Sequence, residues 1–189
     1  MKNYIEKIKD VGLLVPELIP EVKIENAKEV FTNALKYFLS VENKEMVYLT
    51  DYERVIEWLS DNEKKGLMLV GNCGVGKSFI TRYVIPAILY EKKKVIVRVY
   101  DDVNKSVDEI LTKKYAVIDD IGTEEVSNSF GNKRLSFAEI VDNAEKKGNL
   151  LIITTNLSGT QLKEKYGLRV YDRLIKLTTS IAFNGKSLR

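Results

Sequence analysis

The chain has 189 residues, 44% of them apolar, and 30 Lys and Arg against 27 Asp and Glu give a formal net charge of +3. That length and apolar share can bury one substantial core, while a single cysteine and no histidine exclude a disulfide framework and a Cys/His zinc module. No apolar run approaches the roughly 18 residues of a membrane span, and the N-terminus does not read as a signal peptide, so we expect a cytoplasmic location and no membrane partner.

The first predicted helix follows an extended connector that is bracketed by Pro16 and Pro20. Asn26 is a residue type that caps helices, and apolar side chains recur at helical spacing over residues 27–38. We therefore expect a helix with one buried face.

A second helix is predicted to begin at Thr50, because Thr50 and Glu53 have the spacing of a capping box. Gly66 ends the polar run that follows this helix. Beyond Gly66 the pattern changes to strands alternating with helices. We accordingly divide the chain into a helical N-terminal extension or linker, residues 1–49, and a core domain, residues 50–189.

The core domain is predicted to be an α/β fold built on a parallel sheet. The expected strands cover residues 67–70, 95–100, 116–118, 150–155 and 177–183. Their apolar runs are continuous instead of alternating, which is typical of a sheet covered by helices on both faces. Pro86 is expected to kink or end the helix that follows the first strand.

Residues 71–78 read Gly-Asn-Cys-Gly-Val-Gly-Lys-Ser, a complete Walker A loop between a predicted strand and a predicted helix. The glycines allow successive backbone N–H groups to point at phosphate oxygens, and the start of the helix adds its positive dipole end. Lys77 supplies a mobile positive charge and Ser78 a hydroxyl for Mg²⁺. The predicted nucleotide-binding segment is Gly71, Asn72, Cys73, Gly74, Val75, Gly76, Lys77, Ser78 and Phe79. The alternative is a glycine-rich turn that matches by coincidence.

A buried strand that ends in two adjacent carboxylates forms the second chemical element, at residues 115–122. Asp119 is placed to hold Mg²⁺ beside Ser78, and Asp120 could orient or deprotonate an attacking water. Paired acids are also common in turns, so this interpretation depends on the Walker A loop that precedes them.

The strand at residues 150–155 ends at Asn156, and the ends of parallel strands open on one edge of a sheet. Asn156 would then lie beside the carboxylates and could polarise the same water through its amide, although asparagine also opens many turns. Further along, Arg169 and Arg173 lie four residues apart on one helical face, where they could also simply cover a surface.

In this order the four motifs resemble one family, the AAA+ branch of bacterial and phage replicative helicase loaders (DnaC and DnaI type), which is shared with the IstB transposition helpers. The resemblance covers residues 50–189. It implies a three-layer P-loop NTPase with a five-stranded parallel sheet. Because the chain ends within a few residues of the last predicted strand, we expect no C-terminal helical lid.

Carried over by position, the resemblance implies that Asp119 and Asp120 are the Walker B pair, that Asn156 is sensor 1 and that Arg173 is an arginine finger. Such a finger acts on the nucleotide of a neighbouring subunit, so a homo-oligomer with ATP is expected. Arg169 and Arg189 are candidate nucleotide contacts, since the closing residues 185–189 resemble the family's terminal Gly-x-Ser-x-Arg.

The function implied by the resemblance is Mg²⁺-dependent hydrolysis of ATP to ADP and phosphate, used in DNA replication to remodel a hexameric replicative helicase. An IstB-like transposition helper remains an alternative. A nucleotide-gated adaptor with little hydrolysis is another, because Asp120 is shorter than the glutamate of most AAA+ enzymes. Single-stranded DNA is a possible partner through residues 92–94 with Arg98, and through residues 133–134, which could equally be solvated faces. The subunit number stays open.

Overall fold

The computed structural model describes residues 7, 8, 10–13, 15, 17–124, 127–129 and 132–185. Its centre is a five-stranded sheet in the order β2-β3-β6-β1-β7, in which every neighbouring pair is parallel. The strands are β1 (Gly66–Gly71), β2 (Arg98–Tyr100), β3 (Tyr115–Ile121), β6 (Leu150–Thr155) and β7 (Thr178–Phe183). The predicted parallel sheet and α/β fold class are confirmed.

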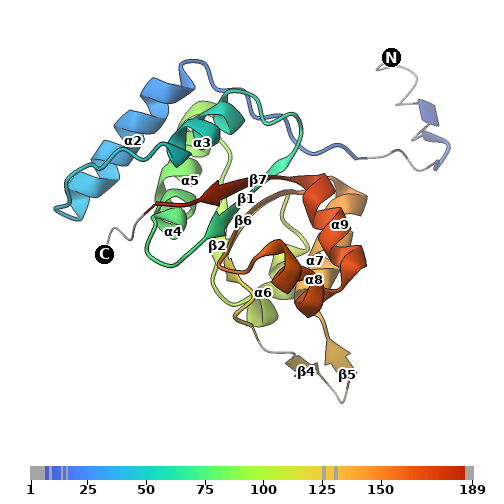
Figure 1. Ribbon diagram of the computed structural model, residues 1–189. Helices are drawn as coiled ribbons and strands as arrows, with labels where there is room; N and C mark the ends of the chain where they lie inside the picture. Colours follow the sequence, from blue (N-terminus) through green and yellow to red (C-terminus); the bar gives the residue numbers. More distant parts are fainter. Residues whose placement is uncertain are drawn as a thin grey trace.

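Helices cover both faces of this sheet (Figure 1). The two faces of the sheet belong to two buried clusters of apolar side chains. In β1, Leu67 and Leu69 belong to one cluster and Met68, between them, to the other. The first cluster includes α2 (Ala27–Val41), α3 (Asp51–Ser60) and α5 (Ile85–Lys93). The second includes α6 (Val103–Ile110), α7 (Ser136–Lys147), α8 (Gly159–Tyr166) and α9 (Leu168–Leu177). The sheet therefore lies between two layers of helices, which confirms the predicted three-layer arrangement.

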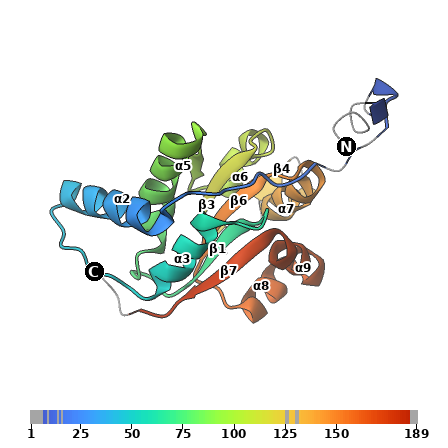
Figure 2. The same ribbon diagram turned by 90° about the horizontal axis from the view of Figure 1, so that it is seen from above.

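The segment before α2 is attached to the core by an asparagine. Asn62 accepts a hydrogen bond from the Val22 backbone N–H at 2.8 Å and donates its amide to the Pro20 carbonyl at 3.0 Å. Figure 2 shows this segment running from the side of α7 to the start of α2. In α2 itself, Phe31 and Leu35 are buried in the same cluster as Leu69 of the sheet. The boundary at residue 49 stays a prediction.

Both predicted helix caps are wrong. Asn26 precedes α2 with φ 52° and makes no side-chain capping bond, since its backbone is left-handed where a capping residue is normally extended. Thr50 precedes α3 in a helical conformation and also caps nothing. The Glu53 carboxylate instead pairs with the Lys28 ammonium at 2.6 Å, so a tertiary ion pair replaces the local bond. A capping box does form at the start of α8, between Ser158 and Gln161.

The helix after the Walker A loop continues through Pro86. It begins as α4 (Lys77–Phe79), widens into the π-helical η1 (Ile80–Val84), and becomes α5, with Pro86 in the first turn. A proline lacks its N–H and crowds the preceding turn of an α-helix. The wider π turn relieves this conflict without ending the helix.

Two further differences concern strands. β2 begins at Arg98, three residues later than predicted, and an antiparallel pair, β4 (Ser127–Ser129) with β5 (Asn132–Arg134), was not predicted.

Among the described residues, none of the helices has the length and apolar content needed to cross a membrane.

Candidate nucleotide-binding site

The Walker A loop leaves β1 at Gly71 and enters α4 at Lys77. Gly74 and Gly76 have φ values of 85° and 88°, a backbone conformation that glycine adopts without strain. Val75, between them, is buried against the core and anchors the loop. The loop therefore has the conformation that its glycines predict.

The two aspartates lie on a bulge at the end of β3. The pairing of β3 with β6 shifts between Ile118 and Ile121, and Asp120 has φ 56°. The Thr154 hydroxyl holds this bulge, since it donates to Asp119 Oδ1 at 2.5 Å and accepts from the Asp120 backbone N–H at 2.8 Å. Such a backbone conformation is costly for a non-glycine residue. The two carboxylates have different partners, Thr154 for Asp119 and Asn156 for Asp120.

Lys77 connects the Walker A loop to the tips of the neighbouring strands. Its ammonium donates to the carbonyls of Gly71 at 2.6 Å and Asn72 at 2.8 Å, and to Asn156 Oδ1 at 3.0 Å. The Asn156 amide in turn donates to Asp120 Oδ1 at 2.8 Å. Burial lowers the pKa of the Lys77 ammonium. Three segments distant in sequence thus meet in one hydrogen-bonded chain, as expected from the parallel sheet.

These side chains line a cavity of about 640 Å³, within the usual range for small-molecule sites. Most of the residues singled out from the sequence line it: Cys73, Gly74, Gly76, Lys77, Ser78, Phe79, Asp119, Asp120 and Asn156. Thr154 and Arg82 line it as well and were not predicted.

The N-terminal region supplies another part of the cavity lining. Leu35 and Leu39 of α2, Val47 of the following loop and Tyr52 of α3 supply apolar surface there. Flat apolar groups such as a nucleobase suit such a wall. The helical pattern over residues 27–38 assigned Leu35 only to a buried face, and nothing in the sequence indicated which residues of this region face the cavity.

Oxygen donors for a hard cation lie together in the cavity: the Ser78 hydroxyl and the carboxylates of Asp119 and Asp120. Mg²⁺ binds such donors but keeps several other oxygen ligands from water or phosphate. Across the described residues there is no group of three or more acidic, histidine or cysteine side chains that could hold a metal. The donor set fits Mg²⁺ that arrives with a triphosphate.

Arg169 and Arg173 lie on α9, outside this cavity. The Arg173 guanidinium pairs with Asp142 and, at 2.7 Å, with Glu145, both on α7. Arg169 is largely exposed and approaches Asp142 only at 3.5 Å. Neither arginine is brought to the chain's own site, so a role at a neighbour's nucleotide stays a prediction. Arg189 and the side chains of residues 133 and 134 lie outside what the structure describes.

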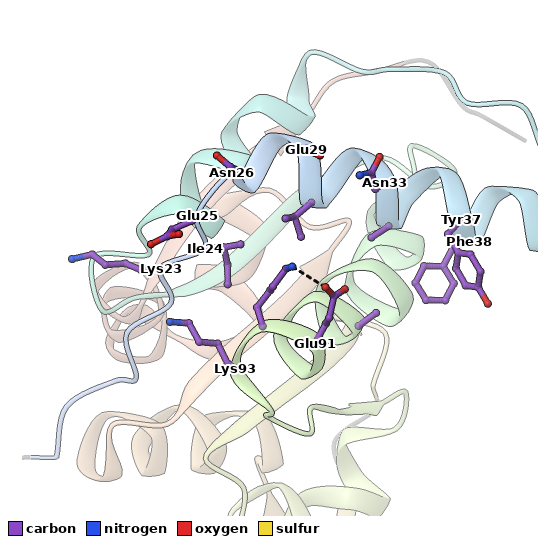
Figure 3. A pocket seen from close by; sticks show the side chains of 14 residues that line it. Lys23, Ile24, Glu25, Asn26, Glu29, Asn33, Tyr37, Phe38, Glu91 and Lys93 are labelled. Carbon is purple, nitrogen blue, oxygen red and sulfur yellow. Dashed lines mark ion pairs between the residues drawn. The ribbon is translucent and has the colours of Figure 1, made fainter.

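A second cavity, of about 850 Å³, lies between α2 and α5 (Figure 3). Its charged lining is mixed: Figure 3 labels Lys23, Lys93 and Glu29, and an ion pair joins Glu91 to Lys92 at 2.7 Å. It contains no glycine loop and no carboxylate pair at strand ends. The larger cavity therefore lacks the chemistry of a phosphate site.

Residues 34–179 match the family model nSTAND3, described as Novel STAND NTPase 3. The chain belongs to the nSTAND3 family. The matched span contains the Walker A loop, both aspartates, Asn156 and the two arginines of α9. The nSTAND3 assignment therefore supports a nucleotide-binding NTPase, and no curated protein matches the chain.

Solved structures of three kinds share the fold of this nSTAND3 protein. A crystal structure of the DnaC helicase loader has a TM-score of 0.61 and 21% identity, covering 74% of this chain and 94% of that chain. A DnaI structure has a TM-score of 0.51 and 24% identity, covering 66% and 73%. AMPPCP-bound DnaA from Aquifex aeolicus has a TM-score of 0.52 and 13% identity, covering 75% and 50%. The predicted likeness to DnaC and DnaI structures is confirmed at the level of the fold.

Proposed function

We propose that this nSTAND3 protein is a Mg²⁺-dependent ATPase that binds ATP in the 640 Å³ cavity. The observation that carries the proposal is the hydrogen-bonded chain from Lys77 through Asn156 to Asp120, next to Ser78 and Asp119. The proposal assigns to these residues a phosphate cradle, a metal-binding pair and a water-orienting pair around one space. The NTPase family assignment supports the same chemistry.

Each side chain has a role in this proposal. Lys77 exchanges its carbonyl partners in the loop for phosphate oxygens. Ser78 and Asp119 would hold Mg²⁺, which neutralises part of the triphosphate charge when bound. Asp120 keeps one oxygen on the Asn156 amide, which leaves the other to orient the attacking water and accept its proton.

For the biological role we propose a replicative helicase loader that acts on a hexameric helicase. The fold shared with DnaC and DnaI structures supports it. Because Arg173 lies on α9, away from the chain's own cavity, it could act as an arginine finger only on a second copy. The proposal therefore includes a homo-oligomer that forms with ATP.

A nucleotide-gated adaptor is the second candidate. It is favoured by Asp120, a short carboxylate on a strained backbone that is already engaged by an amide. In that case ATP would drive assembly while phosphate release stays at background. The IstB-like transposition helper shares every proposed site residue and differs only in its partner.

Phosphate release from Arg173→Ala tests the enzyme. We expect ATP binding to persist and assembly-dependent turnover to fall by about 10³-fold or more, the usual effect of losing an arginine finger. Lys176→Ala is the matched control, because Lys176 lies on the same helix and pairs with the same Glu145 at 2.9 Å. Unchanged turnover in Arg173→Ala, at concentrations where the wild type assembles, would contradict the assignment. Capture of the tagged protein with ATP from its host lysate then tests helicase against transposase.

A further inference from the structure

Arg82 is a second cation beside the Walker B carboxylates. It lies four residues after Ser78, one helical turn further along, and lines the same cavity. Its Nη1 donates to Asp119 Oδ2 at 3.0 Å. The guanidinium also binds Asp101 through both terminal nitrogens, with Nη2 to Oδ2 at 3.0 Å. Arg82 therefore links the predicted metal ligand to a second carboxylate just after β2.

Both oxygens of Asp119 are engaged in this arrangement. Thr154 holds Oδ1 and Arg82 holds Oδ2. Thr154 is 1% exposed and is also fixed by the Asp120 backbone N–H. The Arg82 side chain is 34% exposed, and its other partner, Asp101, is 63% exposed. Of the two contacts to Asp119, the one from Arg82 is the exchangeable one.

We propose that Arg82 is a positioning residue that neutralises Asp119 before the metal–nucleotide complex binds and remains on Asp101 when Asp119 takes up Mg²⁺. The inference rests on the proposed function. Two cations on one carboxylate repel each other, so metal binding must compete with Arg82. A bidentate arginine–carboxylate pair is strong enough to keep the guanidinium ordered after Asp119 is released. Asp101 thus sets how readily Asp119 becomes available.

The predicted signature is the dependence of ATP affinity on Mg²⁺, measured by calorimetry as the ratio of the dissociation constants with EDTA and with Mg²⁺. Arg82→Gln leaves Asp119 uncompensated, so metal-free ATP is repelled while Mg²⁺-bound ATP brings its own cation. We expect the ratio to rise about tenfold, which is the effect of losing one charge interaction in a partly exposed site.

Asp101→Asn has the opposite effect. Without the Asp101 carboxylate, Arg82 has Asp119 as its remaining anionic partner, Mg²⁺ competes less well, and the ratio falls. Arg82→Lys keeps the charge and is expected to restore most of the wild-type ratio. Lys44→Gln is the matched control: it removes one positive charge from the same cavity, where Lys44 pairs with Glu42 at 2.6 Å, and should weaken both affinities alike.

Opposite shifts in Arg82→Gln and Asp101→Asn would support the proposal. Ratios that stay at the wild-type value in both variants, or that shift in the same direction, would overturn it. Should Arg82→Gln fail to fold, Asp101→Asn decides alone, by a lowered or an unlowered ratio. If the wild-type protein shows no ATP binding, either in EDTA or in Mg²⁺, the proposed function is overturned as well. This outcome distinguishes failure of the proposed function from failure of the Arg82 proposal alone.

Discussion

Thr154 is expected to stabilise the site through both aspartates. Replacing Thr154 by valine keeps the side-chain shape and removes one hydroxyl from a position that is 1% exposed. That hydroxyl donates to Asp119 Oδ1 and accepts from the Asp120 backbone N–H. Thr154→Val therefore leaves a carboxylate oxygen and a backbone donor without this partner, at the bulge that carries Asp119 and Asp120.

The expected cost follows from these two bonds. A hydrogen bond to a charged group contributes about 1.5 to 3 kcal/mol and a neutral one about 0.5 to 1.5 kcal/mol. Thr154→Val should therefore lower the free energy of unfolding by about 2 to 4.5 kcal/mol. A loosened bulge should also weaken binding of ATP with Mg²⁺, because Asp119 loses the buried one of its two side-chain contacts and keeps only the exposed one to Arg82.

Thr155→Val is the matched control, since Thr155 is adjacent on β6 and fully buried. Its hydroxyl donates to the Ile121 carbonyl at 2.8 Å and accepts from the Leu157 N–H at 3.1 Å, so it contacts no carboxylate. Urea unfolding is measured for both variants with and without ATP and Mg²⁺. Ligand at 100 times its dissociation constant stabilises a protein by about 2.7 kcal/mol. Thr155→Val should keep the wild-type gain and Thr154→Val should lose most of it.

An equal ligand-induced gain in both variants would refute this reasoning, because the hydroxyl of Thr154 would then support only the fold.

Three other substitutions test separate parts of the account. Lys77→Ala should abolish binding of ATP with Mg²⁺ in a calorimetric titration, and retained binding would contradict the phosphate role. Phe31→Ala should lower the free energy of unfolding by about 3 to 5 kcal/mol in a single transition, because Phe31 is a fully buried side chain of α2 that packs against Tyr52 of α3; two transitions would indicate that α2 folds apart from the core. Burial raises the pKa of Tyr52 from 10.0 to about 12, so its contribution to stability is complete below pH 10 and is lost as the pH rises through 12. Tyr52→Phe should therefore move the midpoint of alkaline unfolding upward, and an unchanged midpoint would contradict that assignment.

The strands and the positions of several candidate site residues could be predicted from the sequence. β6 has the bounds that its continuous apolar run predicts, and Asn156 follows at its tip. The spacing of the Walker A loop predicts its local conformation, because the glycines at 74 and 76 must adopt positive φ values. Parallel pairing then brings Asn156 to Asp120 without further information. Prediction succeeded where the local sequence or the regular pairing of parallel strands determines the geometry.

Other features depend on residues far apart in sequence. Arg82 meets Asp101 and Asp119, which lie 19 and 37 residues away. The apolar wall from Leu35 and Leu39 exists because α2 packs beside the phosphate loop. Glu53 binds Lys28, 25 residues away, and so does not form the predicted capping box. In each case tertiary placement selects one partner among several that the sequence pattern allows.

The central claim is that the Walker A loop and the two aspartates bind one Mg²⁺-bound triphosphate. The most direct test is a calorimetric titration of the wild-type protein with a slowly hydrolysed ATP analogue in the presence of Mg²⁺. The account predicts saturable binding at one site per chain, weakened when EDTA replaces Mg²⁺. No heat of binding with either the analogue or ATP would contradict it.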